Sequence, residues 1–181
     1  MRGHAEQCVE RYLQLAGKSK TSLRSVATPC IDDHQLAPED FEVKGRLHDV
    51  AARIVLKALY LARFGRPDCL WTVNVLAREV TKWTVACDKR LERLMCYLNC
   101  TSNWVLTCWV GDQPKDCKVV LFADASFAGD LRDSKSTSGA FLCLVGPKTF
   151  VPLTWLCKKQ GAAICIKHVN ERRLTLSYYS W

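Results

Sequence analysis

The chain has 181 residues, of which 49% are hydrophobic, and a formal net charge of +8. That length corresponds to about one domain, and the apolar content suffices for a core, which argues against a disordered tail or a secreted mini-scaffold. No apolar run approaches the ~20 residues needed to cross a bilayer. The polar stretch Met1–Tyr12 reads directly into a helix, so it is not interpreted as a signal peptide.

The first half of the chain is expected to be helical. Apolar residues recur at helical spacing in four stretches. Gly17 is a plausible stop for the first of them, and Gly65 with Pro67 ends the second. The four stretches are 5–16, a long one that follows Pro38, 70–80 and 87–98, and a polar loop is expected over 18–37.

After Asn103 the apolar pattern becomes that of β-strands. Four short runs are rich in β-branched and aromatic residues, and turn residues separate them. The last two runs flank Gly146-Pro147-Lys148 and are expected to form a hairpin. Helices followed by strands predict an α+β fold with a small antiparallel sheet, or pieces of two domains. The four runs are Trp104–Val110, Lys118–Ala123, Gly139–Val145 and Phe150–Cys157.

Both parts of the chain are basic. Residues 1–113 carry 16 basic and 13 acidic side chains, whereas residues 114–181 carry 10 and 5. A basic surface attracts phosphate backbones because binding releases counterions. Net charge also serves solubility, so composition alone leaves nucleic-acid binding open.

The chain contains eleven cysteines. Their odd number and the lack of a secretory signal argue against a disulfide framework and favour the cytosol or nucleus. No Cys-x-x-Cys pair exists, and the closest spacings, Cys96–Cys100 and Cys157–Cys165, do not favour a structural zinc site. Cysteines among apolar residues are expected to behave as small core residues. Examples are Cys8, Cys108 and Cys143.

Asp124 is the main candidate for chemistry. It follows the apolar run Val119–Ala123, near the end of an expected strand, and small residues come after it. A carboxylate in that position can hold a divalent metal close to a phosphate. From position alone, an aspartate that caps the next turn is the simpler interpretation.

The context of Asp124 resembles a known family. The segment Phe122–Gly139, which reads FADASFAGDLRDSKSTSG, resembles the opening of the ribonuclease H domain in copia-type retrotransposon polyproteins. Leu153-Thr154-Trp155 with Lys158-Lys159-Gln160 is similar to the third strand of that domain. The resemblance continues upstream and covers roughly residues 5–162. The upstream matches are Thr28-Pro29, Ala58–Leu61, Gly65–Asp68 and Arg90–Leu98, which resemble the segments that connect reverse transcriptase to ribonuclease H.

The resemblance implies an α+β fold in which an N-terminal helical connection region precedes an incomplete ribonuclease H-like antiparallel β-meander. It implies that the chain spans the end of one domain and the start of the next. The implied parts are the end of a reverse transcriptase over 1–17, a linker loop over 18–37, connection helices with one short strand over 38–113, the start of a ribonuclease H-like domain over 114–162, and an unmatched tail over 163–181.

The resemblance also implies an active site. The family's nuclease cuts the RNA strand of an RNA–DNA hybrid with two Mg²⁺ ions held by four acidic residues. Asp124 matches the first acid, and Ser126 stands where the family usually has a further Asp. The match stops at Ala162, and Glu171 lies at about the distance of the second acid among neighbours that do not fit; the remaining acids would lie beyond Trp181. Because Mg²⁺ needs several anionic partners, a lone Asp124 is expected to bind it weakly and to support no appreciable catalysis.

Polymerase chemistry is not expected. Cys30-Ile31-Asp32-Asp33 superficially resembles the Tyr-x-Asp-Asp of reverse transcriptases, but it lies in a polar loop without a preceding strand. Asp32 and Asp33 are therefore interpreted as loop acids.

The resemblance implies an ancestral role in processing RNA–DNA hybrids during reverse transcription. Basic residues near Asp124 are expected to contact the backbone of the hybrid, although solvated strand ends would look the same. These residues are Arg132, Lys135, Lys158 and Lys159. Two alternatives stay open: a non-catalytic basic nucleic-acid-binding module, and a non-functional translated remnant with an unstable half-sheet and an exposed edge.

Overall fold

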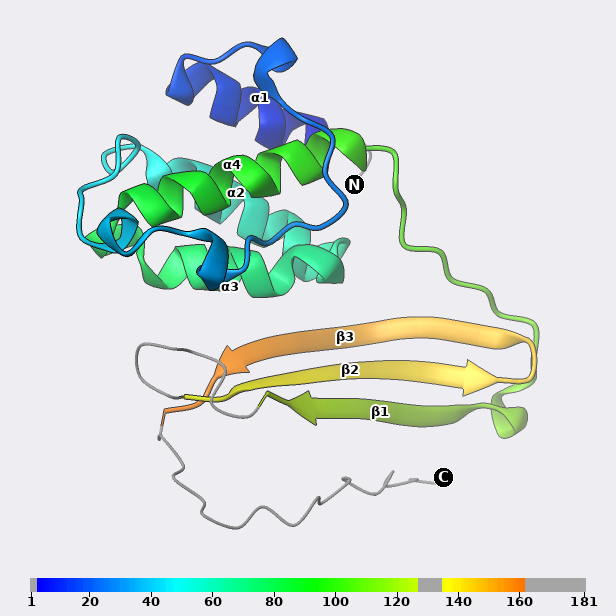
Figure 1. The fold of residues 1–181 in the computed structure, drawn as a ribbon. Coiled ribbons are helices and arrows are strands. Elements are labelled where there is room, and N and C mark those ends of the chain that lie inside the picture. The colour runs from blue at the N-terminus through cyan, green and yellow to red at the C-terminus, as the bar shows by residue number, and fades with distance from the viewer. Residues whose placement is uncertain (1–2, 127–134, 162–181) are drawn as a thin grey trace. The chain divides into compact units, whose positions relative to one another are not determined.

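The computed structural model describes residues 3–126 and 135–161. The fold is mixed α+β, with the helices first and the strands second (Figure 1). The chain divides into two compact units, Met1–Leu106 and Thr107–Trp181. We refer to them as the helical unit and the sheet unit and describe each by itself. The finer subdivision implied by the family resemblance stays a prediction.

Four α-helices build the helical unit. They are α1 (His4–Ala16), α2 (Ala51–Phe64), α3 (Leu70–Arg78) and α4 (Val85–Cys100) (Figure 1). α1 packs against α2 and α4, and α3 packs against the same two helices. Fully buried side chains from all four helices form the core, among them Tyr12, Ile54, Val73 and Leu91. Burial of one large apolar side chain contributes roughly 1.5–3 kcal/mol, so this shared core holds the helices together.

The start of α2 differs from the prediction. The expected long helix after Pro38 is wrong before Ala51, because residues 38–41 form only a short 3-10 helix. The Asp88 carboxylate, far along the chain on α4, accepts the backbone N–H of Arg46 at 2.6 Å and that of Leu47 at 3.3 Å. These two bonds hold the chain in a turn where the apolar pattern alone favoured a helix.

The segment between α1 and α2 lies along α4 (Figure 1). Three basic side chains of α4 fasten it: Arg93 donates to the carbonyl of Thr28 at 2.9 Å, Lys89 pairs with Asp40 at 2.5 Å, and Arg90 pairs with Asp33. Asp32 accepts the backbone N–H of His34 at 3.1 Å. Asp32 and Asp33 thus serve the local structure of the helical unit, in line with their interpretation as loop acids.

Three strands form the sheet unit's antiparallel meander. They are β1 (Lys118–Ala125), β2 (Thr137–Gly146) and β3 (Thr149–Lys159), in the order β1-β2-β3. Pro147 and Lys148 link the last two strands, which confirms the expected hairpin. Leu153 is left without a partner where the register shifts, so it marks a β-bulge. The C-terminal ends of β1 and β3 lie at the end of the sheet that is opposite this hairpin (Figure 1).

The predicted strand over Trp104–Val110 is wrong. Only Trp109 pairs, through hydrogen bonds of 2.9 and 3.1 Å with Phe150. The next backbone N–H groups, those of Gly111 and Asp112, donate to the side-chain oxygen of Thr149 at 3.1 Å each. They therefore do not continue the backbone pairing with β3. β-favouring residues without a partner strand therefore stay extended but unpaired.

The cysteines behave as the sequence predicts at two of three positions. Cys8 and Cys143 are fully buried, and burial raises the pKa of the Cys8 thiol to about 11. Cys108 is exposed, so its expected place in the core is wrong. Cys108 lies in the segment 104–110, which forms no strand.

Residues 3–126 and 135–161 show neither a metal cluster nor a membrane-spanning helix. No three His, Cys, Asp or Glu side chains gather there as a metal would require. None of the described helices combines the length and the apolar character that a membrane span demands.

Candidate nucleic-acid interface

Asp124 lies one residue before the end of β1. It pairs with Gly139 on β2, which in turn pairs with Cys157 on β3. Its carboxylate is exposed, and Oδ1 accepts the backbone N–H of Ala125 at 2.8 Å. Because Gly139 has no side chain, the neighbouring strand leaves the space beside Asp124 open.

Two hydroxyl groups lie on the same face as Asp124. Ser126 and Thr137 exchange hydrogen bonds: the Ser126 N–H donates to the Thr137 carbonyl at 2.9 Å, and the Thr137 N–H donates to Ser126 Oγ at 3.0 Å. Side chains alternate between the faces of a sheet, so the register places Asp124, Ser126 and Thr137 on one face. Sequence reasoning did not single out Thr137, and only the strand register could have identified it.

The predicted basic residues divide between the two faces. Lys159 pairs with Thr137 and so shares the face of Asp124, whereas Lys158 pairs with Ser138 on the opposite face. Lys135 lies just before β2 at the same end of the sheet. The structure therefore brings three of the four predicted lysines and arginines to one end of the sheet. Arg132 and Glu171 lie outside the described residues.

The described residues do not fit a two-magnesium site. Asp124 is the one carboxylate at this end of the sheet within 107–126 and 135–161. Asp112 and Asp116 lie near the β2–β3 hairpin instead, where Asp112 accepts the backbone N–H of Lys148 at 2.6 Å. Since Mg²⁺ requires several anionic partners, we derive no metal-dependent step from these residues.

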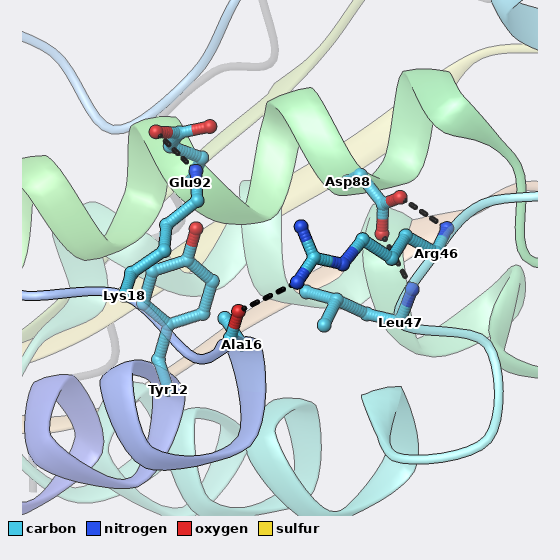
Figure 2. Close-up of a pocket in the computed structure, with 7 residues that line it drawn as sticks. All are labelled: Tyr12, Ala16, Lys18, Arg46, Leu47, Asp88 and Glu92. Carbon is cyan, nitrogen blue, oxygen red and sulfur yellow. Dashed lines mark hydrogen bonds and ion pairs between the residues drawn. The ribbon is translucent and has the colours of Figure 1, made fainter. Parts of the chain in front are cut away.

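The helical unit contains a small charged pocket that sequence reasoning did not predict (Figure 2). Its volume is about 120 Å³. Lys18 pairs with Glu92 at 2.7 Å, and the Arg46 guanidinium donates to the carbonyl of Ala16 at 3.3 Å. The lining residues are Tyr12, Ala16, Lys18, Arg46, Leu47, Asp88 and Glu92.

Neither Lys18 nor Tyr12 of this pocket is poised for proton transfer at neutral pH. Burial acts to lower the pKa of Lys18, but hydrogen bonds and charge interactions with Glu92 and Tyr12 outweigh it and raise the pKa. Burial and the Glu92 charge raise the pKa of Tyr12. Both groups therefore keep their protons at neutral pH, and we interpret the pocket as a structural junction between α1, α4 and the turn before α2.

Comparison with known proteins does not place the chain in a family. No protein-family model matches the sequence, and neither curated proteins nor solved structures give a significant match. The resemblance to copia-type polyproteins therefore depends on the sequence motifs around Asp124 and in the connecting helices.

Proposed function

We propose that the chain is a fragment of a copia-type retrotransposon Pol protein whose sheet unit holds RNA–DNA hybrid, or another nucleic acid, without cutting it. The observation that carries this proposal is the end of the sheet at Asp124. Among the described residues Asp124 is the one carboxylate there, on the same face as Ser126 and Thr137, and Lys158 and Lys159 end β3, the strand that pairs with β2. An antiparallel meander in the order β1-β2-β3 is also how a ribonuclease H-like sheet begins.

The chemistry of this end suits phosphate groups. β3 is an outer strand of the described sheet, so Lys158 and Lys159 project from its two faces at one edge. Lysine and hydroxyl side chains bind phosphate oxygens and position a nucleic acid without reading its sequence. The net charge of +8 adds a long-range attraction for polyanions.

Hybrid binding is expected to weaken steeply with salt and to depend on the two lysines. The double variant Lys158→Gln/Lys159→Gln should reduce the slope of log affinity against log salt by about 2, because each phosphate contact contributes about 0.9. The measurement is fluorescence anisotropy of a labelled RNA–DNA hybrid over a salt series. Lys148→Gln, at the opposite end of the sheet, is the matched control and should leave the slope unchanged. Salt-independent binding would count decisively against the proposal.

Cleavage of the hybrid is expected to stay at background in the presence of Mg²⁺. The variant Asp124→Asn should bind the hybrid as well as the natural chain or slightly better, because it removes a negative charge near the phosphates. A gel assay on an end-labelled hybrid measures cleavage, and anisotropy measures binding. Mg²⁺-dependent cleavage that Asp124→Asn abolishes would refute the non-catalytic proposal.

A non-functional translated remnant is the second candidate. It is favoured by the exposure of large apolar side chains on the sheet, since Leu121, Phe122 and Leu156 are each about half exposed. Such a surface stabilises a sheet poorly. A cooperative melting transition of the sheet unit within the full chain argues against this candidate, and hydrogen exchange of the backbone amides of β1, β2 and β3 follows that unit separately.

A further inference from the structure

We propose that the outward face of α2 binds single-stranded nucleic acid, with bases stacking on Tyr60 and Phe64 and phosphates contacting Arg53 and Arg63. This inference goes beyond the proposed binding of hybrid at the sheet. It depends on the helical unit alone, so the two can fail separately.

The outward face of α2 is apolar and exposed. Leu56, Tyr60 and Phe64 are 60%, 52% and 62% exposed. They are four residues apart, which places them in one row along the helix. The opposite face of α2 is fully occupied, because Ile54, Val55 and other core residues are buried there. The exposed row therefore is not part of the core of the helical unit.

Aromatic rings form a continuous strip on this face. The rings of Tyr60 and Phe64 lie 4.9 Å apart between centroids, and the ring of His4, on α1, lies 5.3 Å from that of Tyr60. The Tyr60–Phe64 pair is tilted at 45° and the His4–Tyr60 pair at 53°, so neighbouring rings contact each other in a tilted arrangement. Exposed rings held in this way offer flat surfaces on which bases of any sequence can stack.

The charged side chains of α2 itself are all positive. α2 carries Arg53, Lys57 and Arg63 and no acidic residue. Helical geometry places Arg53 and Arg63 on the same side of α2 as Tyr60 and Phe64, about 15 Å apart along the axis. Within the described residues neither arginine side chain makes a hydrogen bond or an ion pair, whereas the Lys57 side chain donates to Gln7 at 3.2 Å. The two arginines are thus available to phosphates.

The pattern distinguishes a nucleic acid from other partners. A purely apolar partner gains nothing from unpaired arginines at both ends of the row, whereas a polyanion that also carries flat bases uses both kinds of side chain. The single-stranded form is favoured over a duplex, because bases must leave their own stack to reach the rings. A cavity of about 750 Å³ borders Phe64, and its lining includes the ring of Trp104 and one carboxylate, that of Glu6.

The test is binding of the full chain to a labelled oligothymidine, which forms no duplex of its own. Tyr60→Ser and Phe64→Ser are each expected to weaken binding about tenfold. Both side chains are exposed, and serine has a helix propensity close to that of tyrosine and phenylalanine. The variants should therefore melt like the natural chain, which circular dichroism checks. Arg53→Gln/Arg63→Gln should reduce the salt slope of binding by about 1.4, because each phosphate contact on a single strand contributes about 0.7.

Two matched variants separate stacking from other effects. Leu56→Ser removes an apolar group of similar exposure from the same row and should leave binding unchanged. Tyr60→Phe should keep the binding because the ring remains. Equal loss in Leu56→Ser and Tyr60→Ser would overturn the proposal in favour of an apolar docking face for protein. Oligothymidine binding that survives Tyr60→Ser/Phe64→Ser would overturn it outright, as would binding of anionic phospholipid vesicles in place of the oligonucleotide.

If one of the two proposals fails, the other can still be tested. Loss of oligothymidine binding in the α2 variants, combined with hybrid binding that ignores Lys158→Gln/Lys159→Gln, refutes only the function proposed for the sheet. The converse pattern refutes only the function proposed for α2.

Discussion

Asp68→Ala is expected to lower the free energy of unfolding by about 2–3 kcal/mol, because it leaves the charge of Arg66 buried without its counter-ion. Arg66 is 5% exposed. It donates to both oxygens of Asp68, at 3.0 Å from Nε to Oδ1 and 2.7 Å from Nη2 to Oδ2. The loss should stay below the 3–5 kcal/mol typical of fully buried pairs, since about a third of the Asp68 side chain reaches solvent.

The expected loss is large because Arg66 joins two distant parts of the helical unit. It lies in the turn after α2, yet it also donates to the carbonyl and the hydroxyl of Thr101, at the end of α4, at 2.9 and 2.7 Å. Its guanidinium lies over the rings of Tyr97 and Trp104, at 5.4 and 5.7 Å from the centroids. Without Asp68 this arrangement loses the anion that orients the guanidinium.

The effect of Asp68→Ala should depend on pH. Burial acts to raise the pKa of Asp68, but hydrogen bonds and the charge of Arg66, with the hydroxyl of Tyr97, outweigh it and hold the pKa below its usual value. A carboxyl whose pKa is lower in the folded state stabilises that state fully above its unfolded-state pKa of about 4. The stabilisation is lost as the pH falls through the folded-state pKa. The difference between the natural chain and Asp68→Ala should therefore be constant near neutral pH and shrink in acid.

Urea unfolding at neutral and acidic pH, followed by circular dichroism, measures this prediction. Asp49→Ala is the matched control. Asp49 is 81% exposed and contacts His48 at 2.8 Å, so its removal should change the unfolding free energy by less than about 0.5 kcal/mol. Equal losses in the two variants would show that Asp68 is no more important than a surface carboxylate.

Gly45→Ala is expected to destabilise the helical unit by about 3 kcal/mol through a backbone clash. A Cβ atom at Gly45 would lie 2.4 Å from the carbonyl oxygen of Thr84 and 2.7 Å from Cδ1 of Trp83. The two segments cannot simply separate, because the Gly45 N–H donates to the Trp83 carbonyl at 3.0 Å and the Val85 N–H donates to the Val43 carbonyl at 2.9 Å. The clash should therefore disrupt the turn that leads into α2.

Gly65→Ala provides the control for this variant, and denaturant unfolding measures both. At Gly65 the nearest atom to a new Cβ is the Leu61 carbonyl oxygen at 4.0 Å, and the φ of −163° is one that alanine adopts freely. This variant should keep its stability or gain up to about 1 kcal/mol, because alanine restricts the unfolded chain. A loss at Gly65 as large as that at Gly45 would mean that the steric explanation is wrong.

Local patterns sufficed for most of the fold. The apolar spacing predicts α1, α3 and α4, and the turn residues predict the β2–β3 hairpin, because neighbours in sequence determine these elements. Local patterns do not predict the turn before α2, because Asp88 stabilises it from more than forty residues away. The residue types of Trp104–Val110 predict a strand, but strand formation also needs a neighbouring strand, and the residue types of one segment do not reveal whether it has one.

The sequence predicts some features of the candidate sites and not others. Asp124 followed from its motif, whereas the separation of Lys158 and Lys159 onto opposite faces required the strand register. The strip on α2 leaves a signal in the sequence. Tyr60 and Phe64 fall outside the apolar stripe that the core uses, and arginines flank them. A second, aromatic stripe of this kind on a predicted helix is a sequence signal for a binding surface.

The edges of the sheet bear on how its binding is measured. Within the described residues β1 pairs only with β2, so its other edge presents eight residues without a proline, of which Lys118 and Asp124 carry charge. An edge of this kind is a template for pairing with a second copy of the chain. Such pairs would carry two sets of lysines on one particle, and the apparent affinity for a long nucleic acid would then rise with protein concentration through avidity. Dilute protein and short oligonucleotides therefore give the intrinsic affinity of each site.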